Sequence, residues 1–563
     1  MHLQYLGTTA PAGIAVTTHS ELANGTETTT WFVENITTQP IAVDRVQLRW
    51  KMVGQRQIRM FRHGYQSWSA SGGATLDTAI DPSRTPGSLA LVRGMHHADP
   101  AIAGLGEVRS ELVTVLADDE SAWCLGFDGG DRHDGTFRIT GNELEAEAFF
   151  GGAVFAQGER REMHRVRITQ GACDEVSRLL DVWATWASKC SGARIDAPYQ
   201  VGWCSWYQYF HDVTEADVRD NLAAAANWPI DVFQLDDGFQ ACIGDWLLRA
   251  DTFPTPLEEL AADIERAGYV PGIWLAPFLC APTSRIAAEH PEWVVQLAPG
   301  KPLIGMVNPG WGGTTWTLDT SNPEVLAHLE SLAATLVGMG WRYLKLDFTY
   351  APSLPGLWHD PSMTPAQRVR AGYDAIRRGA GDDVFILGCG APLGACIGVV
   401  DGMRIGPDVA PHWSTANLNW RPPGYEDCEP ATANGWRNTL SRSFMHRRLW
   451  LNDPDCLMLR TQDTALTEDQ MHAWAYAVAM SGGMALISDN LGALNSDSRK
   501  LLDEVIEIGR AVDAASIAGH APQCPDLLAE TTPTTIVNGQ GRLVADIEVG
   551  SATFEAEKPI ANV

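Results

Sequence analysis

Two aspartates, Asp347 and Asp408, are the residues of this chain best suited to carry out chemistry. Each lies toward the end of a short apolar run, 341–348 and 402–408, and such runs are typical of buried strands. If these strands run parallel in one closed barrel, both carboxylates reach the same rim of it. A pair of acids at that rim is what the hydrolysis of a glycosidic bond requires.

The neighbours of the two aspartates suggest different protonation states. Lys345 and Asp347 are two residues apart on a strand and point to the same face, so the cation is expected to keep Asp347 ionised, as a nucleophile must be. A buried ion pair that only satisfies itself is the structural alternative. Asp408 would need desolvation or a nearby anion, such as Asp347, to hold a proton near neutral pH. Alternatively, it caps a helix after Pro407.

Polar and aromatic side chains also end the other apolar runs. Asp236 and Asp237 form an adjacent pair that could accept hydrogen bonds from vicinal sugar hydroxyls or bind a divalent metal. Asp455 and Asp489 could equally be turn residues or helix N-caps. The remaining residues at these run ends are Trp206, Trp274, Cys389, Arg404 and Asp453.

Eight strand-like runs alternate with helical stretches in the middle of the chain, which predicts a (β/α)8 TIM barrel. A doubly wound sheet is the alternative. Segments 214–227 and 256–267 have helical periodicity, and Thr214 is the expected N-cap of the first. The runs are 200–206, 230–237, 269–277, 341–348, 383–390, 402–408, 449–455 and 484–490.

The regions on either side of the barrel have a different pattern. Short, alternating, β-branched segments such as 28–33 and 41–48 predict an N-terminal β-sandwich over residues 1–185. The barrel is expected over 186–515, after a helix near 175–187. Segments 532–537 and 542–547 predict a small C-terminal β-domain over 516–563.

Composition excludes several classes of partner. The chain has 563 residues and a net charge of −28, which argues against nucleic acid and anionic membranes. We expect no signal peptide and no membrane-spanning helix. Eleven cysteines without a close CxxC pair predict reduced thiols in a cytoplasmic protein, and no Cys/His cluster has zinc-ligand spacing.

Taken in order, a set of motifs between about residues 60 and 490 resembles glycoside hydrolase family 36, the clan D α-galactosidases or melibiases. The likeness is to the compact branch of that family, because longer members are richer in glycine where this chain has the segment 388–393. The motifs are GWCSWY at 202–207, QLDDG at 234–238, GDW at 244–246, GIWLAPF at 272–278, KLDF at 345–348, LGCG at 387–390, RIGPD at 404–408 and LNDPD at 451–455.

The resemblance implies an N-terminal β-supersandwich, a catalytic barrel and a C-terminal β-sheet domain, with no metal or organic cofactor. It implies that Asp347 is the nucleophile and Asp408 the acid/base of a retaining double displacement, with carboxyl groups roughly 5–5.5 Å apart. It also implies a galactose site. In that site Asp236 and Asp237 bind O4 and O6, Lys345 and Arg404 reach other hydroxyls, Trp274 and Trp206 wall the sugar, Cys389 lies near O2 and Trp68 closes the site from the N-terminal domain.

Several functions stay open at this point. The principal hypothesis is hydrolysis of terminal α-galactosyl residues of melibiose- or raffinose-type oligosaccharides. Small residues at 391–395 leave room for α-N-acetylgalactosaminidase activity, and β-L-arabinopyranosides are a further possible substrate. A transglycosylase, a non-catalytic sugar-binding protein and, more remotely, a metal-dependent hydrolase are the other hypotheses. The sequence does not predict the oligomeric state.

Overall fold

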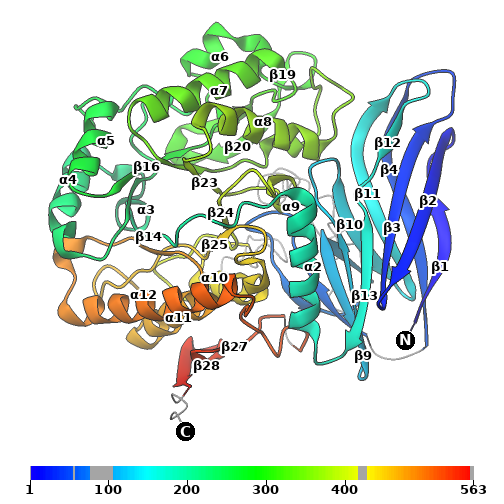
Figure 1. Cartoon of the computed structure of the whole chain (residues 1–563). Coiled ribbons are helices and arrows are strands. Elements are labelled where there is room, and N and C mark those ends of the chain that lie inside the picture. The colour runs from blue at the N-terminus through cyan, green and yellow to red at the C-terminus, as the bar shows by residue number, and fades with distance from the viewer. Residues whose placement is uncertain (1, 55–57, 77–105, 416–427, 530, 558–563) are drawn as a thin grey trace.

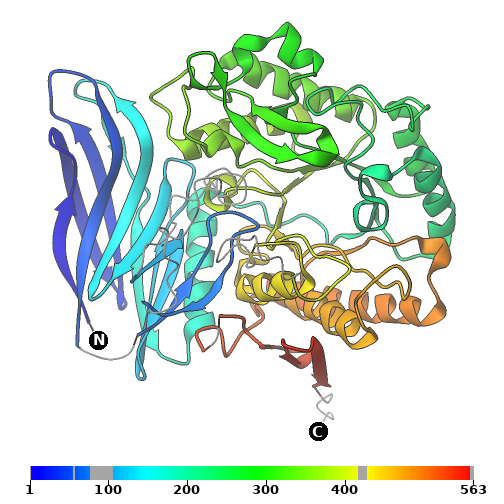
Figure 2. The same cartoon turned by 180° about the vertical axis from the view of Figure 1, so that it is seen from behind.

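The computed structural model describes residues 2–54, 58–76, 106–415, 428–529 and 531–557 of the chain. These residues form a sheet-rich N-terminal part, a central barrel and a small C-terminal sheet (Figures 1 and 2). The predicted fold class is therefore confirmed, and the doubly wound alternative is wrong. Within the described ranges, no helix is both long and apolar enough to span a membrane.

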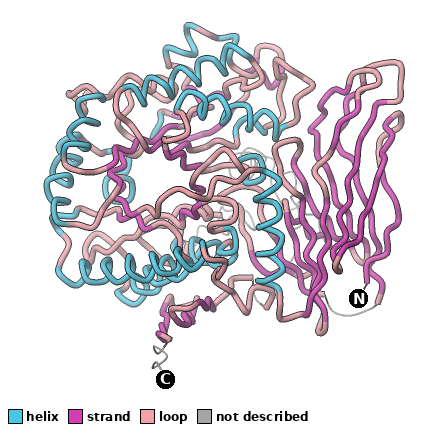
Figure 3. Tube along the Cα trace, viewed as in Figure 1, coloured by secondary structure: helices cyan, strands magenta, loops and turns pink. Residues whose placement is uncertain are grey.

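Eight parallel strands form the barrel, in the order β25-β24-β23-β22-β16-β15-β14-β26. The bridge between Leu457 and Ile487 joins the chain after β25 to β26, so the ring is nearly closed (Figure 3). Every predicted run contains one of these strands. The strands are β14 (Val201–Cys204), β15 (Val232–Leu235), β16 (Val270–Leu275), β22 (Tyr343–Leu346), β23 (Phe385–Gly388), β24 (Gly402–Arg404), β25 (Leu451–Asp453) and β26 (Ala485–Ile487).

Helices surround the barrel, and local capping explains where several of them begin. The predicted N-cap Thr214 is confirmed, because it forms a capping box with Asp217 at the start of α4. Thr364 and Thr467 cap α8 and α11 in the same way. The helices are α3 (Trp206–Tyr209), α4 (Glu215–Ala224), α5 (Leu257–Arg266), α6 (Arg285–Glu289), α7 (Pro323–Gly338), α8 (Pro365–Ala380), α9 (Leu393–Cys396), α10 (Thr432–Ser441), α11 (Glu468–Ser481) and α12 (Ser496–Ile517).

The observed strands are shorter than the predicted runs, because the backbone of each run leaves the strand ladder before the polar residues at the end of the run. After β24, for instance, residues 405–408 form a loop, and Pro407 has no N–H to donate. The connection between β16 and α7 also contains small sheets that the sequence analysis did not predict. They consist of β17 (Leu279–Cys280), β18 (Gln296–Ala298), β19 (Lys301–Pro302), β20 (Ile304–Asn308) and β21 (Gly313–Thr317).

The N-terminal part consists of two antiparallel sheets. Their orders are β1-β4-β11-β10-β7 and β12-β3-β13-β9-β8-β5-β6, and β2 pairs with β3. The helix α2 (Val176–Ser191) lies between these sheets and the barrel (Figure 1). The strands are β1 (His2–Thr9), β2 (Ile14–Ala23), β3 (Thr26–Asn35), β4 (Ile41–Val53), β5 (Arg59–Arg62), β6 (Gly72–Ala74), β7 (Glu107–Glu111), β8 (Val113–Ala117), β9 (Ser121–Phe127), β10 (Asp134–Thr140), β11 (Glu143–Phe155), β12 (Arg160–Glu162) and β13 (Val166–Ala172).

At the C-terminus, β27 (Thr535–Asn538), β28 (Gly541–Asp546) and β29 (Ser551–Ala556) form an antiparallel sheet. This sheet contacts α11, where the ring of Phe554 stacks on that of Tyr476 with centroids 5.1 Å apart. The sequence-based boundaries between the three domains stay predictions.

The segment 63–71 of the N-terminal part is fastened to the barrel by Arg442, which is fully buried. Its guanidinium donates to the carbonyl oxygens of Gly64, Gln66 and Ser67 at 2.7–3.1 Å. It also donates to the carbonyl of Ile405, three residues before Asp408, at 2.7 Å. A single side chain thus ties the N-terminal segment to the loop that carries Asp408.

We expect Arg442→Met to lower the free energy of unfolding by at least about 3 kcal/mol, because it leaves several buried carbonyl groups without a donor. Urea denaturation followed by tryptophan fluorescence measures this change. Arg178→Met is the control, since Arg178 is 52% exposed in its pair with Glu175 and should change stability by at most about 0.5 kcal/mol. Equal unfolding midpoints for the two variants would contradict the anchoring role.

Candidate active site

Asp347 directly follows β22, and both of its carboxylate oxygens accept hydrogen bonds. The indole Nε1 of Trp274 donates to Oδ2 at 3.0 Å, and the backbone N–H of Phe348 donates to Oδ1 at 2.8 Å. Phe348 has a φ of 53°, so the backbone turns sharply after the aspartate. Trp274 was expected to wall a sugar, and the structure shows that it also fixes the orientation of Asp347.

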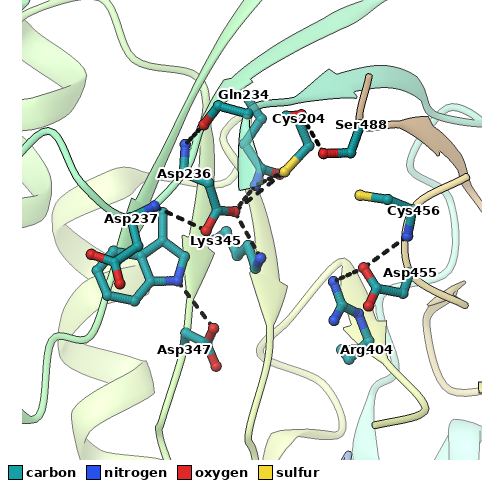
Figure 4. Close-up of polar contacts among 12 residues, drawn as sticks. Cys204, Gln234, Asp236, Asp237, Lys345, Asp347, Arg404, Asp455, Cys456 and Ser488 are labelled. Carbon is teal, nitrogen blue, oxygen red and sulfur yellow. Dashed lines mark hydrogen bonds and ion pairs between the residues drawn. The ribbon is translucent and has the colours of Figure 1, made fainter. Parts of the chain in front are cut away.

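Lys345 does not pair with Asp347 as the sequence analysis expected. Its Nζ lies 2.8 Å from Oδ2 of Asp236, which follows β15, two strands away from β22 in the barrel (Figure 4). Burial is the largest single influence on Lys345 and acts to lower its pKa, but Asp236, with smaller contributions from Cys204 and Cys389, holds that pKa well above its ordinary value. Lys345 and Asp347 do not pair because Asp347 lies beyond the end of β22, whereas Lys345 points into the barrel beneath it.

The adjacent acids Asp236 and Asp237 follow β15 and are both buried. Asp236 accepts from Lys345, from Nε2 of Gln234 at 2.5 Å and from the thiol of Cys204 at 3.4 Å. The Asp237 carboxylate is held by a separate set of donors, described below. Each carboxylate therefore has a fixed position and its own partners.

Asp408 lies in the loop after β24, and its side chain is 33% exposed. Desolvation by the surrounding protein is the largest cause that raises its pKa to about 7, and the negative charges of Asp455 and Asp347 act in the same direction. The positive charges of Arg404 and Lys345 oppose the rise. The two aspartates singled out in the sequence thus interact electrostatically, and one of them can exchange a proton near neutral pH.

Arg404 lies at the end of β24 and binds three carboxylates. Its Nη1 is 3.0 Å from Oδ1 of Asp408, its Nε is 2.9 Å from Oδ2 of Asp453, and its Nη2 is 2.8 Å from Oδ1 of Asp455. Burial acts to lower the pKa of Arg404, but the charges of Asp453 and Asp455 are the main influences that hold it well above its ordinary value. All three of these partners are acids, and the expected contact of Arg404 with sugar hydroxyls stays a prediction.

The remaining predicted site residues are Trp206, Trp68 and Cys389. Trp206 begins α3, and its ring packs edge-on against His211 with centroids 4.9 Å apart. Trp68 lies against Phe348 with centroids 5.1 Å apart, so the N-terminal part does reach the surroundings of Asp347. Cys389 follows β23 and is fully buried, and burial raises the pKa of its thiol well above the ordinary value.

The sequence analysis missed three residues that fix Asp237. Trp311 donates its indole N–H to Oδ2 at 2.7 Å, and Gln240 donates to Oδ1 at 2.5 Å. Nδ1 of His211 lies 3.1 Å from Oδ2, and this contact raises the pKa of the imidazole. Trp311 stands among glycines in the segment 310–313. That context was the only signal in the sequence, and it does not indicate a contact across the barrel rim.

Comparisons with known proteins agree with this geometry. Residues 197–353 match the family model described as Melibiase. One similar solved structure is TtGalA, an alpha-galactosidase from Thermus thermophilus in complex with stachyose. It is 26% identical, with a TM-score of 0.70, and the likeness covers 87% of this chain and 99% of that one. These findings confirm the resemblance to the melibiases of glycoside hydrolase family 36.

Curated relatives match over shorter segments. Alpha-galactosidase AgaA of Geobacillus stearothermophilus is 25% identical over 151 residues, which are 25% of this chain and 20% of the relative. A type blood alpha-D-galactosamine galactosaminidase of Flavonifractor plautii is 30% identical over 128 residues, 22% of this chain and 11% of the relative. The chain thus matches a fifth or less of the length of these two relatives. The roles of the individual site residues stay predictions.

The raised pKa of Asp408 has a consequence for stability. An acid whose pKa rises from 3.8 to about 7 on folding destabilises the fold when ionised. This free-energy cost is fully present above pH 7, shrinks as the pH falls from about 7 to about 4, and vanishes below about pH 4. At pH 8, Asp408→Asn should therefore raise the free energy of unfolding by roughly 1–2 kcal/mol, allowing for the partial exposure of the side chain.

Denaturant unfolding at pH 8 and pH 5 measures this difference, which should be smaller at the lower pH. Asp382→Asn is the control, because Asp382 is 84% exposed beside Arg194. An Asp408→Asn variant that is no more stable than wild type at pH 8 would show that the ionised carboxylate is not destabilising.

Proposed function

We propose that this protein is a retaining α-galactosidase that hydrolyses terminal, non-reducing α-D-galactosyl residues of short oligosaccharides of the melibiose and raffinose type. One observation carries the proposal. At one rim of the barrel, an aspartate held by two hydrogen-bond donors lies within electrostatic reach of a second aspartate whose pKa is about 7. A nucleophile and a proton donor are the two groups that a retaining glycosidase needs.

The reaction follows from these protonation states. Asp408 gives its proton to the glycosidic oxygen while the Asp347 carboxylate attacks the anomeric carbon, so the aglycone leaves as an alcohol and a β-linked glycosyl-enzyme forms. Asp408, now ionised, removes a proton from water, which attacks the same carbon and releases α-galactose and Asp347. The indole of Trp274 keeps Asp347 aimed during both steps. Two inversions give net retention.

The contacts of the remaining residues support recognition of galactose. Asp236 and Asp237 present buried carboxylates whose positions are fixed by Lys345, Trp311 and Gln240. Fixed acceptors suit the axial O4 and the O6 of galactose, because an epimer would leave them unpaired. The loop 391–395 is tied to segment 65–67 by hydrogen bonds of 3.0–3.2 Å. A loop held in this way favours a substrate with a free O2 over a 2-acetamido sugar.

A panel of nitrophenyl glycosides tests the substrate class. We expect turnover of the α-galactoside to exceed that of the α-N-acetylgalactosaminide, α-galactosaminide, β-L-arabinopyranoside and α-glucoside. Product analysis at high concentrations of a sugar acceptor separates hydrolysis from transglycosylation. Binding of galactose without turnover of any member of the panel would overturn the proposal in favour of a sugar-binding protein, and preferred cleavage of a 2-amino sugar would reassign the substrate.

The assignment of Asp347 has its own test. Asp347→Ala should reduce turnover of an aryl α-galactoside by about 10³-fold or more, because no covalent intermediate can form. Added azide should restore turnover by attacking from the vacated side and should yield β-galactosyl azide. Asp382→Ala is the control and should retain activity. Near-normal activity of Asp347→Ala, or rescue that yields the α-azide, would contradict the assignment.

We also propose that the protein is cytoplasmic. All eleven cysteines lie within the described residues as free thiols, which is consistent with a reducing compartment. Fractionation of the source cells tests this location.

A further inference from the structure

Asp455 is a buried carboxylate beside the site for which the sequence analysis gave no role. It lies two residues after β25, its side chain is fully buried, and its φ is 93°. Its Oδ1 lies 2.8 Å from Nη2 of Arg404 in an ion pair and accepts a hydrogen bond from the backbone amide of Cys456 at 2.7 Å. Its Oδ2 accepts from the hydroxyl of Tyr207 and from the amide of Val409 at 2.9 Å.

Two of these contacts lead directly to Asp408. Arg404 binds Asp455 through Nη2 and Asp408 through Nη1, so one guanidinium bridges the two acids (Figure 4 shows the Asp455 half of this bridge). Val409 is the residue after Asp408, so the second contact fixes the backbone that carries the Asp408 side chain. The two connections are independent, because one runs through a side chain and the other through the main chain.

The charges around Asp408 determine which acid holds the proton. Burial is the largest influence on Asp455 and raises its pKa, while the charge of Arg404 and the hydrogen bond from Tyr207 oppose that rise. Among the described residues, the Asp408 carboxylate accepts a hydrogen bond from Arg404 alone, whereas Asp455 accepts from a hydroxyl and two backbone amides. Asp408 therefore has fewer donors that stabilise its anion, and it takes up a proton more readily. The titratable and charged groups around Asp408 are Arg404, Asp455 and, from the neighbouring elements, Asp347, Lys345, Tyr207 and Cys389.

We propose that Asp455 is a positioning residue for Asp408. Its carboxylate shares Arg404 with the acid/base, holds the Val409 amide beside it and places a second acidic group next to it. This inference rests on the proposed function, in which Asp408 donates the proton. Asp455 itself touches no reacting atom, and its effect is to keep Asp408 protonated at the pH at which the enzyme works.

The principal variant is Asp455→Asn, which removes the charge but keeps an acceptor for the Val409 amide. Asn also tolerates the left-handed backbone better than most residues do. Asp455→Gly is the second variant, because glycine suits a φ of 93° without strain. It keeps the test open if the first variant folds poorly.

Asp489→Asn is the matched control. Asp489 also follows a barrel strand, is fully buried and pairs with an arginine, Arg460, at 2.8 Å. Burial raises its pKa too. If the loss of any buried ion pair at the barrel rim were enough to shift the Asp408 pKa, Asp489→Asn would shift it as much as the two Asp455 variants do.

The first measurement is the titration of the Asp408 carboxyl by ¹³C NMR of protein labelled at aspartate, with Asp408→Asn identifying the signal. Removing the neighbouring anion, and leaving Arg404 with fewer partners, should lower the Asp408 pKa by roughly one to two units in Asp455→Asn and Asp455→Gly. The pKa should not move in Asp489→Asn. This readout does not require the protein to be active.

The second measurement is the pH dependence of kcat/KM for two α-galactosides. The fall in rate at high pH should move to lower pH by the same amount, because less Asp408 is protonated. The loss at neutral pH should be larger for melibiose, whose leaving group needs the proton, than for a dinitrophenyl galactoside, whose leaving group does not. A merely structural role would reduce both rates equally and leave the pH profile in place.

The outcomes separate the inference from the proposed function. An unchanged Asp408 titration in both Asp455 variants, or the same shift in Asp489→Asn, would overturn the role of Asp455 even if the wild type is an active α-galactosidase. A wild type that cleaves no galactoside would overturn the proposed function, whereas the NMR titration would still decide whether Asp455 controls the proton on Asp408.

Discussion

One buried cation shared among three carboxylates is the constraint on which the rest of the site depends. Arg404 contacts Asp408, Asp453 and Asp455, and a single positive charge cannot neutralise three negative ones. Asp453 and Asp455 also accept hydrogen bonds from backbone amides, whereas among the described residues the Asp408 side chain accepts from Arg404 alone. Asp408 is therefore the acid that takes up a proton most readily. A second pair, Lys345 with Asp236, neutralises itself on the other side of the barrel interior. Asp347 lies near both groups but forms its hydrogen bonds with Trp274 and with the backbone, so the two aspartates have different environments.

The fold provides these environments by bringing strand ends together. In a parallel barrel the C-terminal ends of all strands meet at one rim, so residues more than 200 positions apart in the sequence become neighbours. Two additions complete the rim. The connection after β16 carries Trp311 over to Asp237, and Arg442 fastens the segment bearing Trp68 beside the loop that follows Cys389. Hydrogen bonds hold both additions in place, and a binding site needs such support if its geometry is to persist without ligand.

Sequence reasoning succeeded where a local pattern has one structural outcome. Alternation of apolar runs and helical stretches predicted all eight barrel strands. Thr214 was identified as an N-cap because a threonine followed by acids in the first turn is typical of a helix N-terminus, and the structure shows this cap. It failed where the outcome depends on partners distant in sequence. Proximity along the strand suggested that Lys345 pairs with Asp347, but which acid a lysine meets inside a barrel is decided by neighbouring strands. Asp455 could not be distinguished from a turn residue for the same reason, since its importance comes from Arg404 and Val409.

The central claim, that Asp347 is the nucleophile, is tested most directly by trapping the covalent intermediate. The compound 5-fluoro-α-D-galactopyranosyl fluoride slows both steps by destabilising the positively charged transition state, while its fluoride leaving group still allows the first step. Mass spectrometry of peptides from the inactivated protein then locates the attached sugar. We expect the sugar on the peptide containing Asp347, as an ester of that side chain. A sugar on Asp408 or Asp455 instead would contradict it.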